Sequence, residues 1–180
     1  EKNQRAIVNK LQSKRSSLKK EIQAQQKKIT SLNKEIDRQI ELAIKEQQKA
    51  SDKATPVKVE EDIKLTGSFE SNKGKLPVPI TGPYLIVGNF GVQNVAGMRD
   101  VKINNLGVDL QGNSGSQARA VFDGVVSTVF QQGKGQIGVL VRHGKYISVY
   151  CNLSDISVAK GDKLKTGDII PARITHFEPF

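Results

Sequence analysis

Few residues in this sequence are equipped for chemistry, and they lie in its second half. The chain has two histidines, His143 and His176, and one cysteine, Cys151. A single cysteine excludes a disulfide framework and any cysteine-rich zinc module. Because Cys151 lies in an apolar run, we expect a small buried hydrophobe rather than a reactive thiol. His143 precedes Gly144, which fits either a turn residue or a residue that contacts a ligand.

The elements that position these residues fall into two parts, because the composition changes abruptly along the chain. The first 55 residues contain no Gly, Pro or aromatic residue, whereas all 16 glycines and five of the six prolines lie beyond residue 66. The composition of a chain does not change in this way within a single domain built around one hydrophobic core. We therefore expect a helix over residues 1–55, a linker over 56–75 and a second domain over 76–180.

The composition also excludes several classes of function. The formal charge is +10 and 37% of the residues are hydrophobic. No stretch approaches the ~18 apolar residues that cross a bilayer, which excludes a transmembrane enzyme. Trp is absent and the aromatic residues are three Tyr and six Phe. This scarcity argues against single-stranded nucleic-acid binding by base stacking.

Aliphatic residues recur every seven positions in the first part. Position a holds Val8, Ile22, Ile29, Ile36 and Ala43, and position d holds Leu11, Leu18 and Leu32, with Arg15 at a and Gln25 and Gln39 at d as polar exceptions. This pattern is typical of a coiled coil, and its helix needs a partner because lone helices are marginal in water. Two partners stay open, another segment of the full protein or another chain. We expect Pro56 to end the helix.

The charge of this part has two interpretations. Residues 1–55 contain 14 Lys and Arg against 7 Asp and Glu. The excess fits a solvated outer face, or a stalk near an anionic surface such as membrane headgroups or cell-wall polymer. DNA binding is less favoured, because the basic residues are spread around the helix rather than clustered.

Short apolar runs separated by turn residues dominate the second part. The expected strands are residues 84–87, 101–103, 107–110, 118–122, 125–130, 137–142 and 146–150. Asp123-Gly124 predicts a tight hairpin turn, and residues 131–136 a longer hairpin loop. A turn–strand unit occurs twice, over 158–164 and 165–170. With no helix expected after residue 75, the predicted fold class is α+β, a long coiled-coil helix followed by a small antiparallel β domain.

The order of these segments resembles that of the LytM or M23 peptidase domain, which has the lysostaphin-type fold. This fold is similar to a duplicated hybrid motif. The resemblance covers residues 76–178. Its markers are Gly-Lys-Leu-Pro-Val-Pro at 74–79, Phe90-Gly91, Asn-Leu-Gly-Val-Asp-Leu at 105–110, Ala-Val-Phe-Asp-Gly-Val-Val at 120–126, His143-Gly144, Tyr-Cys-Asn-Leu-Ser at 150–154 and the Gly-Asp pairs of 158–170.

This sequence departs from the pattern of the active members at three positions. Their first motif is His-x-Gly-x-Asp, in which the His and the Asp bind zinc; here Asp109 is present but Asn105 replaces the His. In the active members, the strand motif that begins with a Tyr, at 150–152 here, ends in a His; this chain has Asn152 at that position. Their last motif is His-x-His-Phe-Glu, where this chain has Ile174 and keeps only His176.

These substitutions predict a domain without peptidase activity and without a cofactor. Catalytic zinc needs about three protein ligands and an open water position, and the ligand-type residues left are Asp109 and His176. An Asn carboxamide is neutral and a poor zinc donor. Asn152 and Ile174 cannot carry protons near neutral pH as histidines do. A plainer interpretation of Asp109 is a carboxylate satisfied within its own turn.

The resemblance extends to the EnvC-type family of murein hydrolase activators, which join a coiled coil to a LytM domain that lacks zinc ligands. It implies a bacterial periplasmic protein of cell division that cleaves nothing itself. Its degenerate groove would bind and activate an N-acetylmuramyl-L-alanine amidase near peptidoglycan. Its coiled coil would engage an FtsEX-like membrane complex, and no nucleic acid is involved. The start at Glu1, without Met or an apolar leader, is read as a processed or cut-down product, from which any export signal would already be gone.

The resemblance also assigns the residues that line the groove. They are Asn105, Asp109, Tyr150, Asn152, His176, Phe90, Arg99 and His143. Tyr146 and Tyr150 alternate along one strand, so both also fit core or rim positions.

Three other functions remain open at this stage. The first is an active M23 zinc endopeptidase, against which the missing histidines count. The second is a periplasmic adaptor of an efflux pump, which also joins a helical stalk to a small β domain but does not explain the motifs at 107–109 and 150–153. The third is a structural protein that binds the cell wall without controlling a partner.

Overall fold

The computed structural model describes residues 2–51, 56–94, 102–133 and 135–173. The chain divides into two units, Glu1–Ile36 and Asp37–Phe180. Helix α1 (Lys2–Ser51) makes up the described part of the first unit and enters the second. This confirms the long helix expected from the heptads, and no Gly or Pro interrupts it. Among the described residues, no helix is both long enough and apolar enough to cross a membrane.

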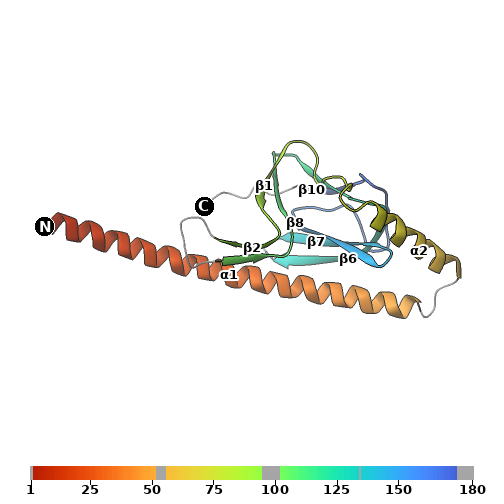
Figure 1. The fold of residues 1–180 in the computed structure, drawn as a ribbon, viewed down its shortest axis with the longest axis horizontal. Coiled ribbons are helices and arrows are strands. Elements are labelled where there is room, and N and C mark those ends of the chain that lie inside the picture. The colour runs from red at the N-terminus through yellow and green to blue at the C-terminus, as the bar shows by residue number, and fades with distance from the viewer. Residues whose placement is uncertain (1, 52–55, 95–101, 134, 174–180) are drawn as a thin grey trace. The chain divides into compact units, whose positions relative to one another are not determined.

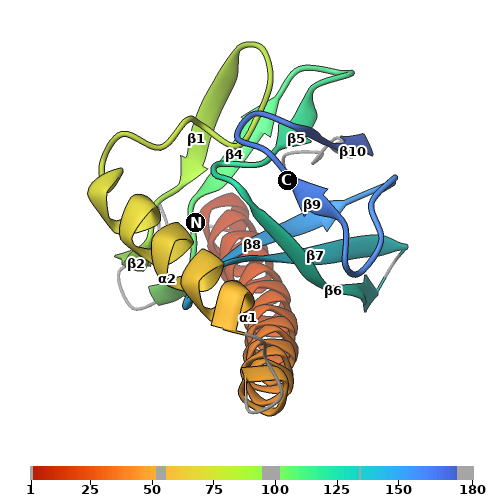
Figure 2. The same ribbon diagram turned by 90° about the vertical axis from the view of Figure 1, so that its right-hand side faces the viewer.

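A second helix, α2 (Pro56–Ser71), occupies most of the segment expected to be a linker. The sequence did not indicate this helix, because the segment shows little periodicity. The described part of α1 ends at Ser51, and Pro56 is the first residue of α2, where a first-turn proline has no helical N–H to lose. The Phe69 ring stacks on His143 at 4.9 Å between centroids. This contact holds α2 against the β domain, beside which the helix lies in Figure 2.

The core of the β domain is a four-stranded antiparallel sheet in the order β8-β7-β6-β9. Its strands are β6 (Gly124–Gly133), β7 (Gln136–His143), β8 (Tyr146–Leu153) and β9 (Lys163–Leu164). The first three are labelled in Figure 1 and β9 is labelled in Figure 2. The buried apolar residues on this sheet and its neighbours are Ala118, Ala120, Val126, Val139, Val141, Tyr150, Leu153, Leu164 and Ile170. Each large side chain buried here contributes about 1.5–3 kcal/mol to folding.

Three two-stranded antiparallel sheets complete the domain. They pair β1 (Tyr84–Gly88) with β4 (Asp109–Gly112), β2 (Gly91–Asn94) with β3 (Lys102–Asn105), and β5 (Gln117–Arg119) with β10 (Ile169–Arg173). All described strand pairs are antiparallel, which confirms the predicted α+β class. Strand β2 was not predicted from the sequence.

The Asp123-Gly124 hairpin is the clearest error of the strand prediction. Gly124 lacks the positive φ that a two-residue hairpin turn requires, and β5 pairs with β10 rather than with β6. The Asp123 carboxylate instead accepts hydrogen bonds from Thr166, 43 residues away. Long-range pairing has overridden the local turn preference. The expected turn after His143 is present, with Gly144 at φ 69°.

Candidate functional site

The candidate site lies where a long two-stranded ribbon is interrupted. Strands β1 and β2 follow one another along one side, and β3 and β4 along the other. Gly91 pairs with Asn105, and Gly88 pairs with Asp109. Between these pairs, the side formed by β1 and β2 has residues 89 and 90, whereas the side formed by β3 and β4 has residues 106–108. Because the two sides differ by one residue, the hydrogen-bonded ladder is broken and the strands bend there. The break places Asn105 and Asp109 together although no helix links them.

Asn105 and Asp109 are joined by their side chains. Asn105 Nδ2 donates to Asp109 Oδ2 at 2.8 Å, and Asn105 Oδ1 accepts from the Gly107 N–H at 3.3 Å. Both ends of the amide are therefore engaged locally. Gly88 makes the arrangement possible, because a Cβ there would collide with the Asp109 carboxylate. Partial desolvation raises the pKa of Asp109 above its ordinary value, and the Asn105 hydrogen bond opposes this rise.

Large apolar side chains surround the break and are exposed to solvent. Phe90, in the break itself, is 72% exposed. The exposed apolar residues of this ribbon, here called the ribbon patch, are Tyr84, Leu85, Ile86, Val87, Phe90, Val92, Leu106 and Val108. So many exposed apolar side chains in one short ribbon make it a candidate interaction site.

Asn152 lies in a β-bulge of strand β8. The register of β7 and β8 shifts between Ile137 and Val139, which leaves Cys151 and Asn152 opposite a single residue. Asn152 has φ 60°, a left-handed conformation that Asn tolerates well, and its N–H donates to Gln132 Oε1 at 2.7 Å. Burial raises the pKa of the Cys151 thiol, and the charge of Asp109 raises it further. The bulge thus lies within electrostatic reach of Asp109.

His143 and Tyr150 are not in an open groove, contrary to the sequence-based prediction. His143 is fully buried, with Nδ1 2.7 Å from the carbonyl oxygen of Asp123 and Nε2 2.8 Å from Ser148 Oγ. Tyr150 is 7% exposed, and its hydroxyl accepts the Val121 N–H at 2.9 Å. Both side chains are core groups whose polar atoms are satisfied, as buried polar groups must be.

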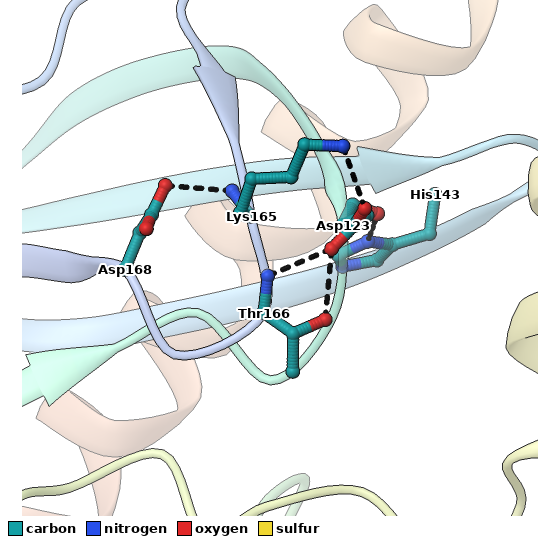
Figure 3. A network of polar contacts seen from close by, with 5 residues as sticks. All are labelled: Asp123, His143, Lys165, Thr166 and Asp168. Atoms are coloured by element: carbon teal, nitrogen blue, oxygen red, sulfur yellow. Dashed lines mark hydrogen bonds and ion pairs between the residues drawn. The ribbon is translucent and has the colours of Figure 1, made fainter.

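A second polar network holds the β9–β10 turn, and the sequence did not reveal it. One Asp123 carboxylate oxygen accepts from the N–H and the hydroxyl of Thr166, each at 2.8 Å, and the other from Lys165 Nζ at 3.0 Å (Figure 3). Asp168 accepts the Lys165 N–H at 2.7 Å. The Thr166 N–H bond is the main cause that lowers the pKa of Asp123. Burial lowers the pKa of His143, and the Asp123 carbonyl opposes this.

Three of the residues named from the resemblance cannot be placed. His176, Arg99 and Ile174 lie outside the described residues. Within the part of the chain that the structure describes, no three His, Cys, Asp or Glu side chains gather as a metal site requires. The described neighbours of Asp109 at the break are the Asn105 amide and exposed apolar residues such as Phe90 and Val108.

The comparison with known families agrees with this architecture. Residues 104–174 match the profile of peptidase family M23. The match spans β3 to β10 and includes Asn105, Asp109 and the Asn152 bulge. The chain therefore carries an M23 peptidase-family domain downstream of its long helix. No curated protein matches the chain.

Proposed function

We propose that this protein is a non-catalytic activator of peptidoglycan amidases, working in the bacterial periplasm during cell division. The observation that carries the proposal is the side-chain pair of Asn105 and Asp109 at the break in the ribbon. These two positions match the zinc-binding motif of the active family members. In this chain they bind one another instead.

The chemistry of the pair supports a role without a metal. The Asn105 atom that could donate to zinc is the amide oxygen Oδ1, which here accepts the Gly107 N–H, while the amide nitrogen donates to Asp109. Displacing these hydrogen bonds would yield only a neutral amide ligand, which binds Zn²⁺ more weakly than imidazole. We infer that the domain neither holds zinc nor hydrolyses peptides, and that it needs no cofactor.

The surroundings of the pair support a protein partner. The ribbon patch offers apolar surface, and Asp109 with Asn105 provides polar groups at its centre. Interfaces of this kind combine an apolar centre with a few oriented hydrogen-bonding groups. We infer that an N-acetylmuramyl-L-alanine amidase docks here and is switched on. Asn152, His176 and Arg99 remain proposed members of the same surface.

The helix has a different proposed role. We infer that α1 works as a docking arm for an FtsEX-like membrane complex at the division site, close to peptidoglycan. The long uninterrupted helix and its heptads support an arm of this kind.

The decisive experiment mixes the full chain with a cognate N-acetylmuramyl-L-alanine amidase and measures dye release from labelled cell wall. We expect stimulated release with the amidase and none from this protein alone. Phe90→Ser should reduce the stimulation about tenfold, which corresponds to ~1.4 kcal/mol of binding free energy. Ile63→Ser is the matched control, because Ile63 is a similarly exposed apolar residue on α2; it should leave stimulation unchanged.

The competing functions give different results in the same assay. Release by this protein alone, abolished by a chelator and accompanied by one zinc per chain in metal analysis, would identify an endopeptidase. Wall binding without any stimulation would identify a structural wall protein. Either result, or equal effects of the two substitutions, would overturn the proposal.

A further inference from the structure

The first turns of α1 carry an apolar seam that nothing in their own unit covers. Val8 at position a, Leu11 and Leu18 at position d, and Ile7 beside them are between 44% and 62% exposed. Every residue from 4 to 20 is exposed. An isolated helix of this kind is marginal in water, so a covered seam would stabilise it.

The same turns carry a strong and unmixed positive charge. From Lys2 to Lys20 there are seven Lys and Arg residues and no Asp or Glu. Three of these cations border or interrupt the seam: Lys14 at position g, Lys19 at position e and Arg15 at position a. The charge is thus concentrated where a partner helix would touch.

A second copy of this chain fits the seam poorly. In a parallel pair, position g of one helix faces position e of the next heptad on the other, which would oppose Lys14 to Lys19 twice. Arg15 at position a would also face the Arg15 of the other copy. An antiparallel pairing of the same turns would likewise bring cations against cations. Like charges held this close repel, and no acidic residue of residues 2–20 relieves them.

A lipid surface also fits less well than a helix. Helices that lie in a membrane interface present a wide apolar face, commonly with aromatic residues. The first 55 residues contain no aromatic residue, and the apolar stripe of residues 4–20 is narrow. Arg15 lies inside the stripe, where an acidic side chain of a facing helix could pair with it but lipid tails could not.

We propose that residues 4–20 of α1 bind an acidic amphipathic helix of another protein. Its aliphatic a and d residues cover Val8, Leu11 and Leu18, and its Asp or Glu residues face Lys14, Arg15 and Lys19. This inference rests on the docking role proposed for α1 and not on the amidase role. It gives the docking arm a partner of defined chemistry, recognised by shape along the seam and by charge beside it.

The test uses the full chain and two synthetic helical peptides of about four heptads, long enough to form a helix on binding. Both peptides have Leu at a and d and the same number of Glu residues. One carries the Glu residues at e and g, beside its seam, and the other at b, c and f, away from it. We expect the first peptide to bind at least tenfold more tightly, and its affinity to fall as salt is raised. No amidase is present, so failure here leaves the amidase proposal intact.

Paired substitutions locate the contact. The double variant Lys14→Glu, Lys19→Glu should lose at least tenfold in affinity for the first peptide. Its matched control, Lys10→Glu, Lys20→Glu, changes the net charge equally at outer positions and should lose less than about threefold. Leu11→Ser with Leu18→Ser should also lose at least tenfold. Circular dichroism of each variant should show that the helix content is retained.

Several results would overturn the proposal. These are equal binding of the two peptides, equal losses in the two charge-reversed variants, or no binding of the first peptide. Tighter binding to vesicles of phosphatidylglycerol than to the first peptide would assign the seam to a membrane instead. Sedimentation that shows a dimer of the wild-type chain, but not of Leu11→Ser with Leu18→Ser, would assign it to a second copy.

Discussion

Two aspartates of the β domain lie in opposite surroundings. Asp123 accepts hydrogen bonds from three donor groups, two on Thr166 and one on Lys165, and its pKa is lowered. Asp109 accepts one from Asn105, lies in the middle of exposed apolar residues, and its pKa is raised. Among the described residues, the Asp123 carboxylate thus accepts more hydrogen bonds than the Asp109 carboxylate.

The difference indicates which polar cluster the molecule needs for folding and which one is free for binding. Donors supplied from distant parts of the chain, as at Asp123, tie segments together and stabilise the native state. Among the described residues, the hydrogen-bond partner of Asp109 is Asn105, four residues away, so this pair ties no distant segments together. Groups whose ionised form is poorly supported are candidates for function rather than stability. Four predictions test this contrast.

The largest effect is expected for His143→Ala, next to the Asp123 network. His143 is fully buried, stacks on Phe69 and uses both ring nitrogens. Its removal leaves a cavity and unpaired polar atoms, so we expect a loss of about 3 kcal/mol in the free energy of unfolding, measured in urea. Phe90→Ala, an exposed position of the ribbon patch, should change it by less than about 0.5 kcal/mol. Equal losses would erase the contrast between the two regions.

The next effect is expected for Asp123→Ala. The substitution removes the acceptor for the Thr166 N–H and hydroxyl, and the ion pair with Lys165 at the surface adds little. We expect a loss of about 1–2 kcal/mol in the free energy of unfolding. Thermal unfolding followed by circular dichroism measures it. If amidase stimulation fell while stability stayed unchanged, Asp123 would belong to the binding site after all.

Much of this fold could be predicted from the sequence, because its main elements follow local periodicity. The heptads of residues 8–43 specify α1, and the alternating apolar runs specify β6, β7 and β8. Helix α2 was missed because its sequence has no clear apolar stripe. It docks instead through single contacts, such as Phe69 on His143 and the Asp62 carboxylate on Arg142 at 2.7 Å. Contacts of this kind leave no repeating pattern.

The site was predicted less well, for a related physical reason. The closeness of Asn105 and Asp109 depends on a break in strand pairing, which the spacing alone does not specify. His143 and Tyr150 were assigned to the groove, yet both are buried by partners distant in sequence, Asp123 and Val121. Whether a polar side chain faces solvent depends on such partners rather than on its own type.

The third prediction concerns pH. Burial lowers the pKa of His143 in the folded state, so the unfolded chain binds this proton more readily. Stability from the neutral ring is therefore complete above about pH 6.5, the ordinary value for histidine, and is lost as the pH falls through the folded pKa. Urea unfolding between pH 7.5 and pH 5 should show this loss, and His143→Gln should flatten the slope. A wild-type slope that the substitution leaves unchanged would assign the loss to other groups.

The smallest expected effect is a change in the free energy of unfolding that differs in sign between Asp109 and Asp123. Because the folded pKa of Asp109 is raised, its ionised form costs stability above the ordinary value of about 3.9, whereas ionised Asp123 contributes stability there. Asp109→Asn should therefore raise the free energy of unfolding at pH 7 by a few tenths of a kcal/mol. Solvent screening at this exposed side chain keeps the gain small. Asp123→Asn should lower the free energy of unfolding in the same urea titration.

A loss at Asp109 comparable with that at Asp123 would mean that the ribbon break, too, is needed for folding. In that case Asp109→Asn could not separate binding from stability, and the amidase assay would have to rely on Phe90→Ser.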